Sequence, residues 1–166
     1  MALAHHHRTA RLTLRPVAAS DEAAVVMGVG DIAVSGWLAV VPHPYSAADF
    51  RAFLTTYAVA GETFAIDDEE GFAGIMGVED GILGYWIAPR AQGRGYATET
   101  ARCLVAAHFD ASDTPLASGC FEGNQRSAKV SAKLGFVEVG RDLKYCRARD
   151  AVLPHVIMRL TREAFV

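Results

Sequence analysis

The sequence contains no long apolar run and no strong excess of charge of either sign. No stretch approaches the roughly 18 consecutive apolar residues that a membrane-spanning helix needs, and no apolar segment of the signal-peptide kind follows the basic residues near the N-terminus. Sixteen Lys and Arg stand against 19 Asp and Glu, a net charge of −3, which is too balanced to bind nucleic acid through bulk charge. These absences predict a cytoplasmic protein with neither a membrane nor a nucleic acid as partner.

Cysteine is scarce, and linkers and repeats are missing. The three cysteines are widely spaced and form no CxxC pair, so they are predicted to be free thiols, and no metal site is predicted. With 166 residues, 51% of them hydrophobic, the chain is long enough for one folded domain. That domain is expected to span residues 11–166, after a frayed terminus at residues 1–10.

The most informative stretch is an apolar segment followed by a glycine-rich loop and a helical pattern. Aromatic and branched residues at 82–88 predict a strand that ends at Pro89. Apolar residues then recur at three- and four-residue steps from Ala97, which predicts a helix from about Tyr96 to Asp110. Because a helix start presents unpaired N–H groups and glycine lets a backbone approach closely, this junction is suited to bind phosphate.

Two common nucleotide-binding loops are excluded at this junction. A phosphate-binding loop of the Walker type needs a lysine directly after its last glycine, where this chain has Tyr96. A dinucleotide-binding fingerprint needs a third glycine where this chain has Thr98. A nucleotide-binding fold of another class and a glycine-rich turn without a ligand stay open as alternatives.

The run Gln92-Gly-Arg-Gly-Tyr-Ala97 resembles the Gln/Arg-x-x-Gly-x-Gly/Ala acyl-coenzyme A signature of the GCN5-related N-acetyltransferase (GNAT) family. Within that family it is most similar to the RimJ/RimL-like branch, which opens on an Arg-Leu-x-Leu-Arg strand as Arg11–Arg15 does. The resemblance implies an α+β fold with a mixed, mostly antiparallel sheet of about six to seven strands and about four flanking helices. It also implies that the fourth and fifth strands splay apart.

Alternation and turn residues predict the other elements. Strands are expected at 11–17, 62–66, 72–78, 82–88, 116–122, 136–145 and 155–160, the last one beginning after Pro154. Helices are expected at 23–29, 47–57, 96–110 and 124–135. The fifth strand should run parallel to the fourth, because a helix crosses between them.

A second motif supports the same resemblance. Asn124-Gln-Arg-Ser127 and Lys133-Leu-Gly-Phe136 are similar to the opening and the close of the fourth helix in the RimJ/RimL-like branch. Asn124 is also a good helix N-cap and Gly135 a good left-handed C-terminal residue. The resemblance implies acetyl-CoA as cofactor, held by Trp86, Ile87, Ala88, Gln92, Gly93, Arg94, Gly95, Tyr96, Ala97, Thr98, Asn124, Ser127 and Lys133.

Acetyl transfer to an amine needs a polarised thioester carbonyl, a base for the amine and an acid for the departing thiolate. A backbone N–H near Ile87 or Ala88 is expected to bind the carbonyl oxygen. Many GNAT proteins place a tyrosine four residues before the closing glycine of the fourth helix, where this chain has Ser131. The resemblance to the RimJ/RimL-like branch implies Ser127 as the acid, unless it only contacts cofactor. Glu122, at the end of the fifth strand near the splay, is predicted as the base.

The predicted function is acetyl-CoA-dependent N-acetyl transfer to a primary amine by direct attack in a ternary complex. Trp37 and Tyr45 are candidates for the wall of the acceptor cleft, with ordinary core packing as the alternative. A protein N-terminal amine is the acceptor that the branch implies, while a small amine stays open. A non-catalytic acyl-CoA-binding module is the competing interpretation, and the sequence leaves open whether the chain forms a homodimer.

Overall fold

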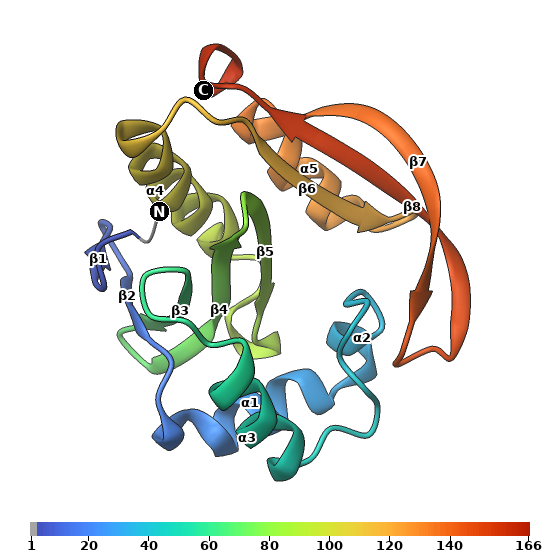
Figure 1. The fold of residues 1–166 in the computed structure, drawn as a ribbon. Helices are drawn as coiled ribbons and strands as arrows, with labels where there is room; N and C mark the ends of the chain where they lie inside the picture. Colours follow the sequence, from blue (N-terminus) through green and yellow to red (C-terminus); the bar gives the residue numbers. More distant parts are fainter. Residues whose placement is uncertain (1–2) are drawn as a thin grey trace.

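The computed structural model describes residues 3–166, which form one mixed sheet with helices on both faces (Figure 1). The strand order is β1-β2-β3-β4-β5-β6-β8-β7. The strands are β1 (His7–Arg8), β2 (Thr13–Pro16), β3 (Thr63–Asp68), β4 (Gly71–Glu79), β5 (Ile82–Ile87), β6 (Leu116–Phe121), β7 (Val137–Cys146) and β8 (Ala151–Leu160). The helices are α1 (Glu22–Gly30), α2 (Ile32–Ser35), α3 (Ala47–Thr56), α4 (Tyr96–Ala111) and α5 (Gln125–Leu134).

The predicted fold class is confirmed, with two short elements that the sequence patterns missed. Helix α2 begins where the Asp31 side chain accepts a hydrogen bond from the Ala33 N–H at 2.8 Å. Strand β1 corrects the prediction of a frayed segment at 1–10, because His7 and Arg8 pair with β2 and the Leu3 N–H donates to Gly61. Residues 1 and 2 lie outside the described residues. A two-residue strand is too short to show alternation, so only its pairing reveals it.

Local capping signals fixed the helix ends as predicted. Ser46 and Asp49 form a reciprocal capping box at the start of α3. The Asn124 side chain accepts a hydrogen bond from the Ser127 N–H at 3.2 Å at the start of α5, and Gly135 ends that helix with φ 95°. Within residues 3–166, no helix combines the length and the apolar character needed to cross a membrane.

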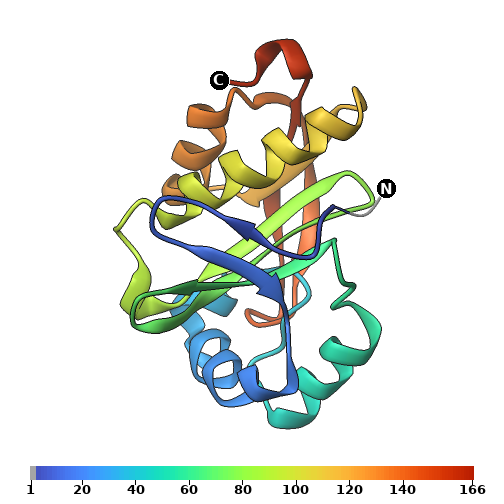
Figure 2. The same cartoon turned by 90° about the vertical axis from the view of Figure 1, so that its left-hand side faces the viewer.

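Two hydrophobic clusters cover opposite faces of the sheet. Leu104 of α4 and Leu134 of α5 are fully buried in the larger cluster, and Val29 of α1 and Phe50 of α3 lie in the smaller one. Neighbouring residues of β4 point to different clusters, as side chains of a strand must. Figure 2 shows the sheet between α4 on one side and α1 and α3 on the other.

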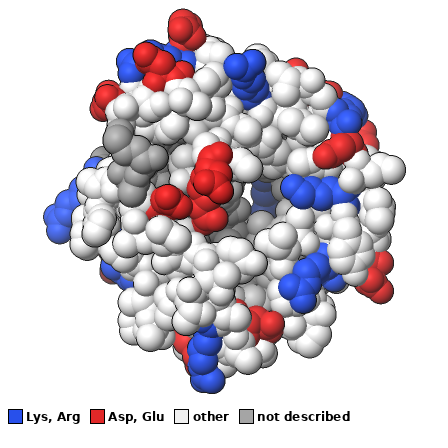
Figure 3. Space-filling model, in the orientation of Figure 1, with Lys and Arg blue, Asp and Glu red and all other residues white. Residues whose placement is uncertain are grey.

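The sheet divides between β5 and β6. These parallel strands share one register pair, Ile82 with Ala117. Beside it the Ala117 N–H donates to the Gly81 carbonyl and the Ser118 hydroxyl to the Leu83 carbonyl. Beyond Leu83 the strands separate, which confirms the predicted splay. Figure 3 shows an opening through the molecule at the place where Figure 1 shows β5 and β6 diverging.

The far end of this opening is closed by the β7–β8 hairpin. The Arg147 N–H donates to the Ala39 carbonyl at 3.0 Å, and the Cys146 sulfur lies 3.7 Å from the Gly36 and Leu38 carbonyl oxygens. The guanidinium of Arg149 stacks on the Trp37 ring at 4.3 Å. The hairpin therefore docks on the segment after α2, and the opening is surrounded by protein.

Strand β8 begins earlier than predicted, at Ala151 instead of His155. Its Pro154 carbonyl accepts a hydrogen bond from the Glu122 N–H at 2.9 Å, so an N–H at that position would also face Glu122. Proline has no N–H to donate to Glu122, but β6 already ends at Phe121. The missing hydrogen bond therefore lies beyond the β6–β8 ladder. Proline is therefore tolerated inside this strand.

Candidate functional site

The loop before α4 has the backbone geometry of an anion site. Gly93 and Gly95 adopt left-handed angles, with φ 76° and 80°, which side chains with a Cβ rarely adopt. Gly95 is the N-cap of the 16-residue α4 and supplies no side-chain cap. The first N–H groups of the helix and its positive dipole end therefore face the loop, an arrangement that favours a negatively charged ligand.

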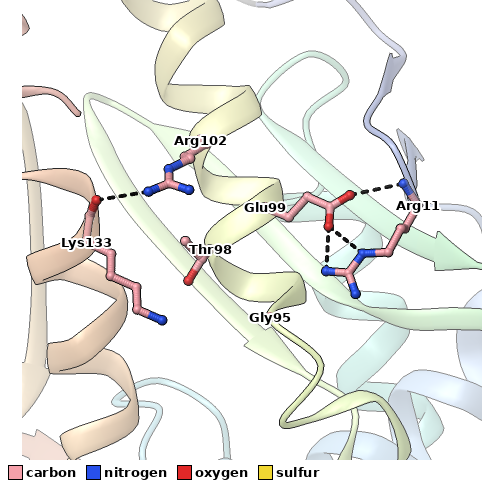
Figure 4. Close-up of a pocket in the computed structure, with 6 residues that line it drawn as sticks. All are labelled: Arg11, Gly95, Thr98, Glu99, Arg102 and Lys133. Carbon is pink, nitrogen blue, oxygen red and sulfur yellow. Dashed lines mark hydrogen bonds and ion pairs between the residues drawn. The ribbon is translucent and has the colours of Figure 1, made fainter.

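A groove of about 640 Å³ lies beside this helix start, between α4 and α5 (Figure 4). Arg102 of α4 donates to the backbone carbonyl of Lys133 of α5 at 3.5 Å. Both helices therefore place a cationic side chain at the groove, Arg102 from one and Lys133 from the other. Burial acts to raise the pKa of Glu99, but hydrogen bonds from Thr9 and Arg11 outweigh it and hold that pKa below its ordinary value. The residues that line the groove are Arg11, Gly95, Thr98, Glu99, Arg102 and Lys133.

Gln92 connects the loop to both sides of the splay. Its side-chain N–H donates to the Ile87 carbonyl of β5 at 3.0 Å, and its side-chain oxygen accepts from Arg126 of α5 at 2.6 Å. Arg94 pairs instead with Glu70 at 2.8 Å, a hydrogen bond that raises the pKa of Arg94. The basic side chains of α5 thus differ in their contacts, since Arg126 is held by Gln92 while Lys133 lines the groove.

The edge of β5 presents backbone groups toward β6. The Ala88 N–H donates to the Ala73 carbonyl at 2.8 Å, so residues 88, 86 and 84 point their backbone groups at β4. By the same alternation, the N–H and carbonyl groups of Tyr85 and Ile87 point toward the gap between β5 and β6. This edge can pair with an extended ligand.

Three side chains meet on the α5 side of the gap. The Tyr85 hydroxyl donates to the Ser127 hydroxyl at 3.4 Å, and burial raises the pKa of Tyr85. Burial also raises the pKa of the Cys120 thiol, against the opposing effect of its hydrogen bond with Ser127. Ser127 therefore lies on the α5 face of the sheet, over the gap between β5 and β6 at the depth of Tyr85.

Comparison with known proteins decides the family. Residues 11–137 match the family described as "Acetyltransferase (GNAT) domain". The chain belongs to the GNAT family. GNAT acetyltransferases use acetyl-CoA, and the predicted family and fold are confirmed.

Relatives of this GNAT protein include ribosomal acetyltransferases. The chain is 26% identical over 129 residues to "Putative ribosomal N-acetyltransferase YdaF" of Bacillus subtilis, a match that covers 63% of this chain and 65% of that protein. A GNAT acetyltransferase of Bacillus anthracis has a similar structure, with a TM-score of 0.82 and 18% identity over 95% of this chain and 99% of that one. RimJ of Mycobacterium smegmatis, in complex with CoA-disulfide, gives 0.75 and 23% identity over 92% of this chain and 82% of that one.

Glu122, the predicted base, does not reach the splay of this GNAT fold. Its carboxylate pairs with Arg141 at 3.2 Å, and Arg141 also pairs with Glu138 at 2.7 Å. Arg141 belongs to β7, which lies beyond β8 on the side of β6 that faces away from β5. The ion pair therefore turns the Glu122 carboxylate away from the gap, to an exposed surface.

The predicted aromatic residues lie in different environments. The Trp86 ring packs on Gly28 and Phe72 in the smaller hydrophobic cluster, and its backbone groups point at β4. Tyr45 packs against the same cluster, and burial, with a contribution from Asp49, raises its pKa to about 12. Trp37 instead lies at the rim of the opening, under Arg149 and near Gly123.

The sequence patterns missed His155, a residue of β8 whose ring lies over β6 on the face opposite to α5. His155 shares a hydrogen bond of 2.8 Å between its Nδ1 and the Asp142 carboxylate, and its side chain is only 12% exposed. Its ring lies over Gly119 and meets Phe121 edge-on. No local pattern marks this pair, because its members come from two strands whose register the sequence does not reveal.

Proposed function

We propose that the chain is an acetyl-CoA-dependent N-acetyltransferase that acts by direct attack of an amine in a ternary complex. One observation carries the proposal: the anion-binding start of α4 and the open edge of β5 lie in line, joined by Gln92. The start of α4 would bind the diphosphate of CoA, and the edge of β5 would pair with its extended amide arm.

Binding of the cofactor follows from these groups. The N–H groups between Gln92 and Thr98 would hold the pyrophosphate, with charge from the helix dipole. Arg102 and Lys133 would hold a further phosphate in the groove between α4 and α5. Beyond the loop, the arm would meet the Ile87 N–H first, since the Ile87 carbonyl already accepts from Gln92, and the backbone groups of Tyr85 next.

The reacting carbonyl is assigned to the level of Tyr85. The proposed acid, Ser127, lies beside Tyr85 and Cys120, so the thioester sulfur must reach that depth to receive its proton. At that depth the Tyr85 N–H is the donor that faces the gap, whereas the Ala88 N–H is already bonded to Ala73. Tyr85 therefore replaces the predicted Ile87 and Ala88 as the donor to the carbonyl oxygen.

The proposed acceptor is the N-terminal amine of a protein, of the ribosomal class named for YdaF. The ring formed by β5, β6 and the docked β7–β8 hairpin suits the passage of an extended chain end. Trp37 at the rim of that ring offers an apolar surface to the first residues. A small amine would need no such passage.

The test measures CoA release with acetyl-CoA and a panel of acceptors: peptides with N-terminal Ala, Ser or Met, free amino acids, spermidine and an aminoglycoside. Turnover with peptides that exceeds turnover with the small amines supports the proposal. Tight CoA binding without turnover on any acceptor would indicate the binding module instead. Preference for a small amine would reject the protein acceptor.

For Ser127→Ala, we expect kcat to fall by about 10- to 100-fold, because the thiolate loses its proton donor, while the Kd for CoA changes by less than about two-fold. Ser131→Ala is the matched control, since Ser131 is also a serine of α5 and is buried one turn further on. Stopped-flow acetylation and calorimetry separate the two constants. A loss of CoA affinity alone would leave Ser127 as a binding residue.

A further inference from the structure

His155 and Asp142 form a hydrogen-bonded pair that lies outside the acyl-CoA signature motifs. They stand opposite each other in the β7–β8 register, and the imidazole Nδ1 lies 2.8 Å from the Asp142 carboxylate oxygen. The carboxylate is half exposed, whereas the histidine side chain is 12% exposed. An imidazole held in this way on a strand is oriented by its partner.

The hydrogen bond fixes which imidazole nitrogen is free. An ionised carboxylate only accepts hydrogen bonds, so Nδ1 of the neutral ring must carry the proton. Nε2 is then the unprotonated nitrogen, with a lone pair available to accept a proton. It lies on the edge of the ring that covers β6, since a Cβ built on Gly119 would be 2.6 Å from it.

The position of Gly119 shows where Nε2 lies relative to the splay. Strands β5 and β6 are parallel and in register at Ile82 and Ala117, so Gly119 stands at the level of Gly84, next to Tyr85. The ladder to β8 uses the backbone groups of Cys120 and Glu122, and those of Gly119 therefore face the gap. Nε2 lies over the rim of the gap at the depth assigned to the thioester.

His155 and Ser127 lie on opposite faces of the sheet. Val156 and Met158, the neighbours of His155 that point the other way, are buried in the cluster under α4 and α5. Ser127 belongs to α5 on that side, and His155 faces the side on which Trp37 and the hairpin surround the opening. An amine that enters through the opening would approach the thioester from the side of His155.

We infer that His155 is the general base that accepts the proton of the attacking amine, and that Asp142 is the positioning residue that holds its Nε2 toward the gap. The inference rests on the proposed transferase function and replaces Glu122 in that role. In the step, the neutral amine attacks the thioester carbon, a C–N bond forms and the C–S bond breaks. The proton lost by nitrogen goes to Nε2, and the thiolate takes a proton from Ser127, which solvent restores.

The charged groups around the ring come from two strands. Strand β7 supplies Asp142, with Lys144 next along the same face, and β8 supplies Arg159 further toward its end. The side chains of β6 on this face are Ala117, Gly119 and Phe121, which carry no charge. Asp142 is therefore the charged group in direct contact with His155, and protonation of Nε2 should stop the reaction at acid pH.

His155→Gln should lower kcat by about 100-fold or more with an N-terminal peptide as acceptor, because a general base contributes a factor of that order. The Kd for CoA should stay within about two-fold. Toward acid pH the rate of the wild-type enzyme should fall more steeply than that of the variant, which keeps only the loss caused by protonation of the acceptor amine. For His155→Ala, added imidazole should restore part of the rate, which a purely structural role would not allow.

Asp142→Asn should keep CoA affinity, lower kcat by about 10-fold, and move the acid limb of the rate profile to lower pH. His108→Gln is the matched control, because His108 lies on α4 with its Nε2 bonded to the Thr114 carbonyl, outside the site.

The outcomes separate this inference from the proposed function. A wild-type chain that binds CoA but acetylates no amine defeats the transferase proposal itself. An active wild type with a His155→Gln variant that keeps kcat within about three-fold, and the same pH profile, rejects only the role of His155. The thermal unfolding midpoint of each variant, measured with acetyl-CoA present, distinguishes a loss of rate from a loss of fold.

Discussion

Gly95→Val should raise the Kd for CoA by at least about 100-fold, which corresponds to about 2.7 kcal/mol. Gly95 has φ 80° at the point where the helix begins, and valine is strained at such angles. The new side chain would stand between the peptide nitrogens and the pyrophosphate. Calorimetric titration with CoA measures the loss.

A control must show that the loss of CoA affinity comes from the position of Gly95 and not from backbone strain alone. Gly81→Val is the matched control, because Gly81 has φ 77° with open space around it and lies in the β4–β5 turn. Each substitution should cost about 1 to 3 kcal/mol of backbone strain, which a domain of 5 to 15 kcal/mol withstands. Equal CoA affinity in the two variants would show that the loop before α4 does not bind the pyrophosphate.

Arg15→Leu should reduce the free energy of unfolding by about 3 kcal/mol, because it leaves a buried carboxylate without its partner. The Arg15 guanidinium binds both oxygens of Asp21, at 2.8 and 2.9 Å, and both oxygens of Asp67. Asp21 is 4% exposed and accepts a further hydrogen bond from the Ala18 N–H. Urea denaturation at pH 7 measures the change.

Arg51→Leu is the control for this prediction. Arg51 makes a similar two-point contact with Glu22 on the surface, where it is 68% exposed, and its loss should cost less than about 1 kcal/mol. Similar losses for the two variants would show that the burial of Asp21 does not matter.

The effect of Arg15 should depend on pH in a defined direction. Burial acts to raise the pKa of Asp21, but hydrogen bonds from Arg15 and Ala18 outweigh it and hold the pKa below its ordinary value. A lowered native pKa stabilises the fold above the unfolded value of about 3.9, and this contribution is lost as the pH falls through the native pKa. The difference between wild type and Arg15→Leu should therefore shrink below about pH 4.

Elements with local signals were predictable to within a few residues. The capping box at Ser46 and the glycine at 135 are contacts within a single helix end, so the sequence alone is enough to place them. Strand β1 and helix α2 were not predicted because each is too short to form a pattern. The early start of β8 depends on where β6 ends, which is a tertiary fact.

The candidate site divides in the same way. The glycines at 93 and 95 and the start of α4 lie within a few residues, and their geometry agrees with the predicted phosphate cradle. Glu122 was chosen as base by its position at the end of a strand, but the ion pair with Arg141 directs its carboxylate elsewhere. A pattern along the chain carries no information about a partner 19 residues away on another strand.

The sequence by itself determined the family, through its motifs. It also determined the order of most elements and the glycine-rich loop before α4, because these depend on contacts between near neighbours. Only the tertiary structure decided which side chains from different elements meet: Ser127 with Tyr85 and Cys120 on one face of the sheet, His155 with Asp142 on the other. The physical reason is strand register. A shift of one residue would turn His155 to the opposite face, and register is set by the packing of the whole sheet.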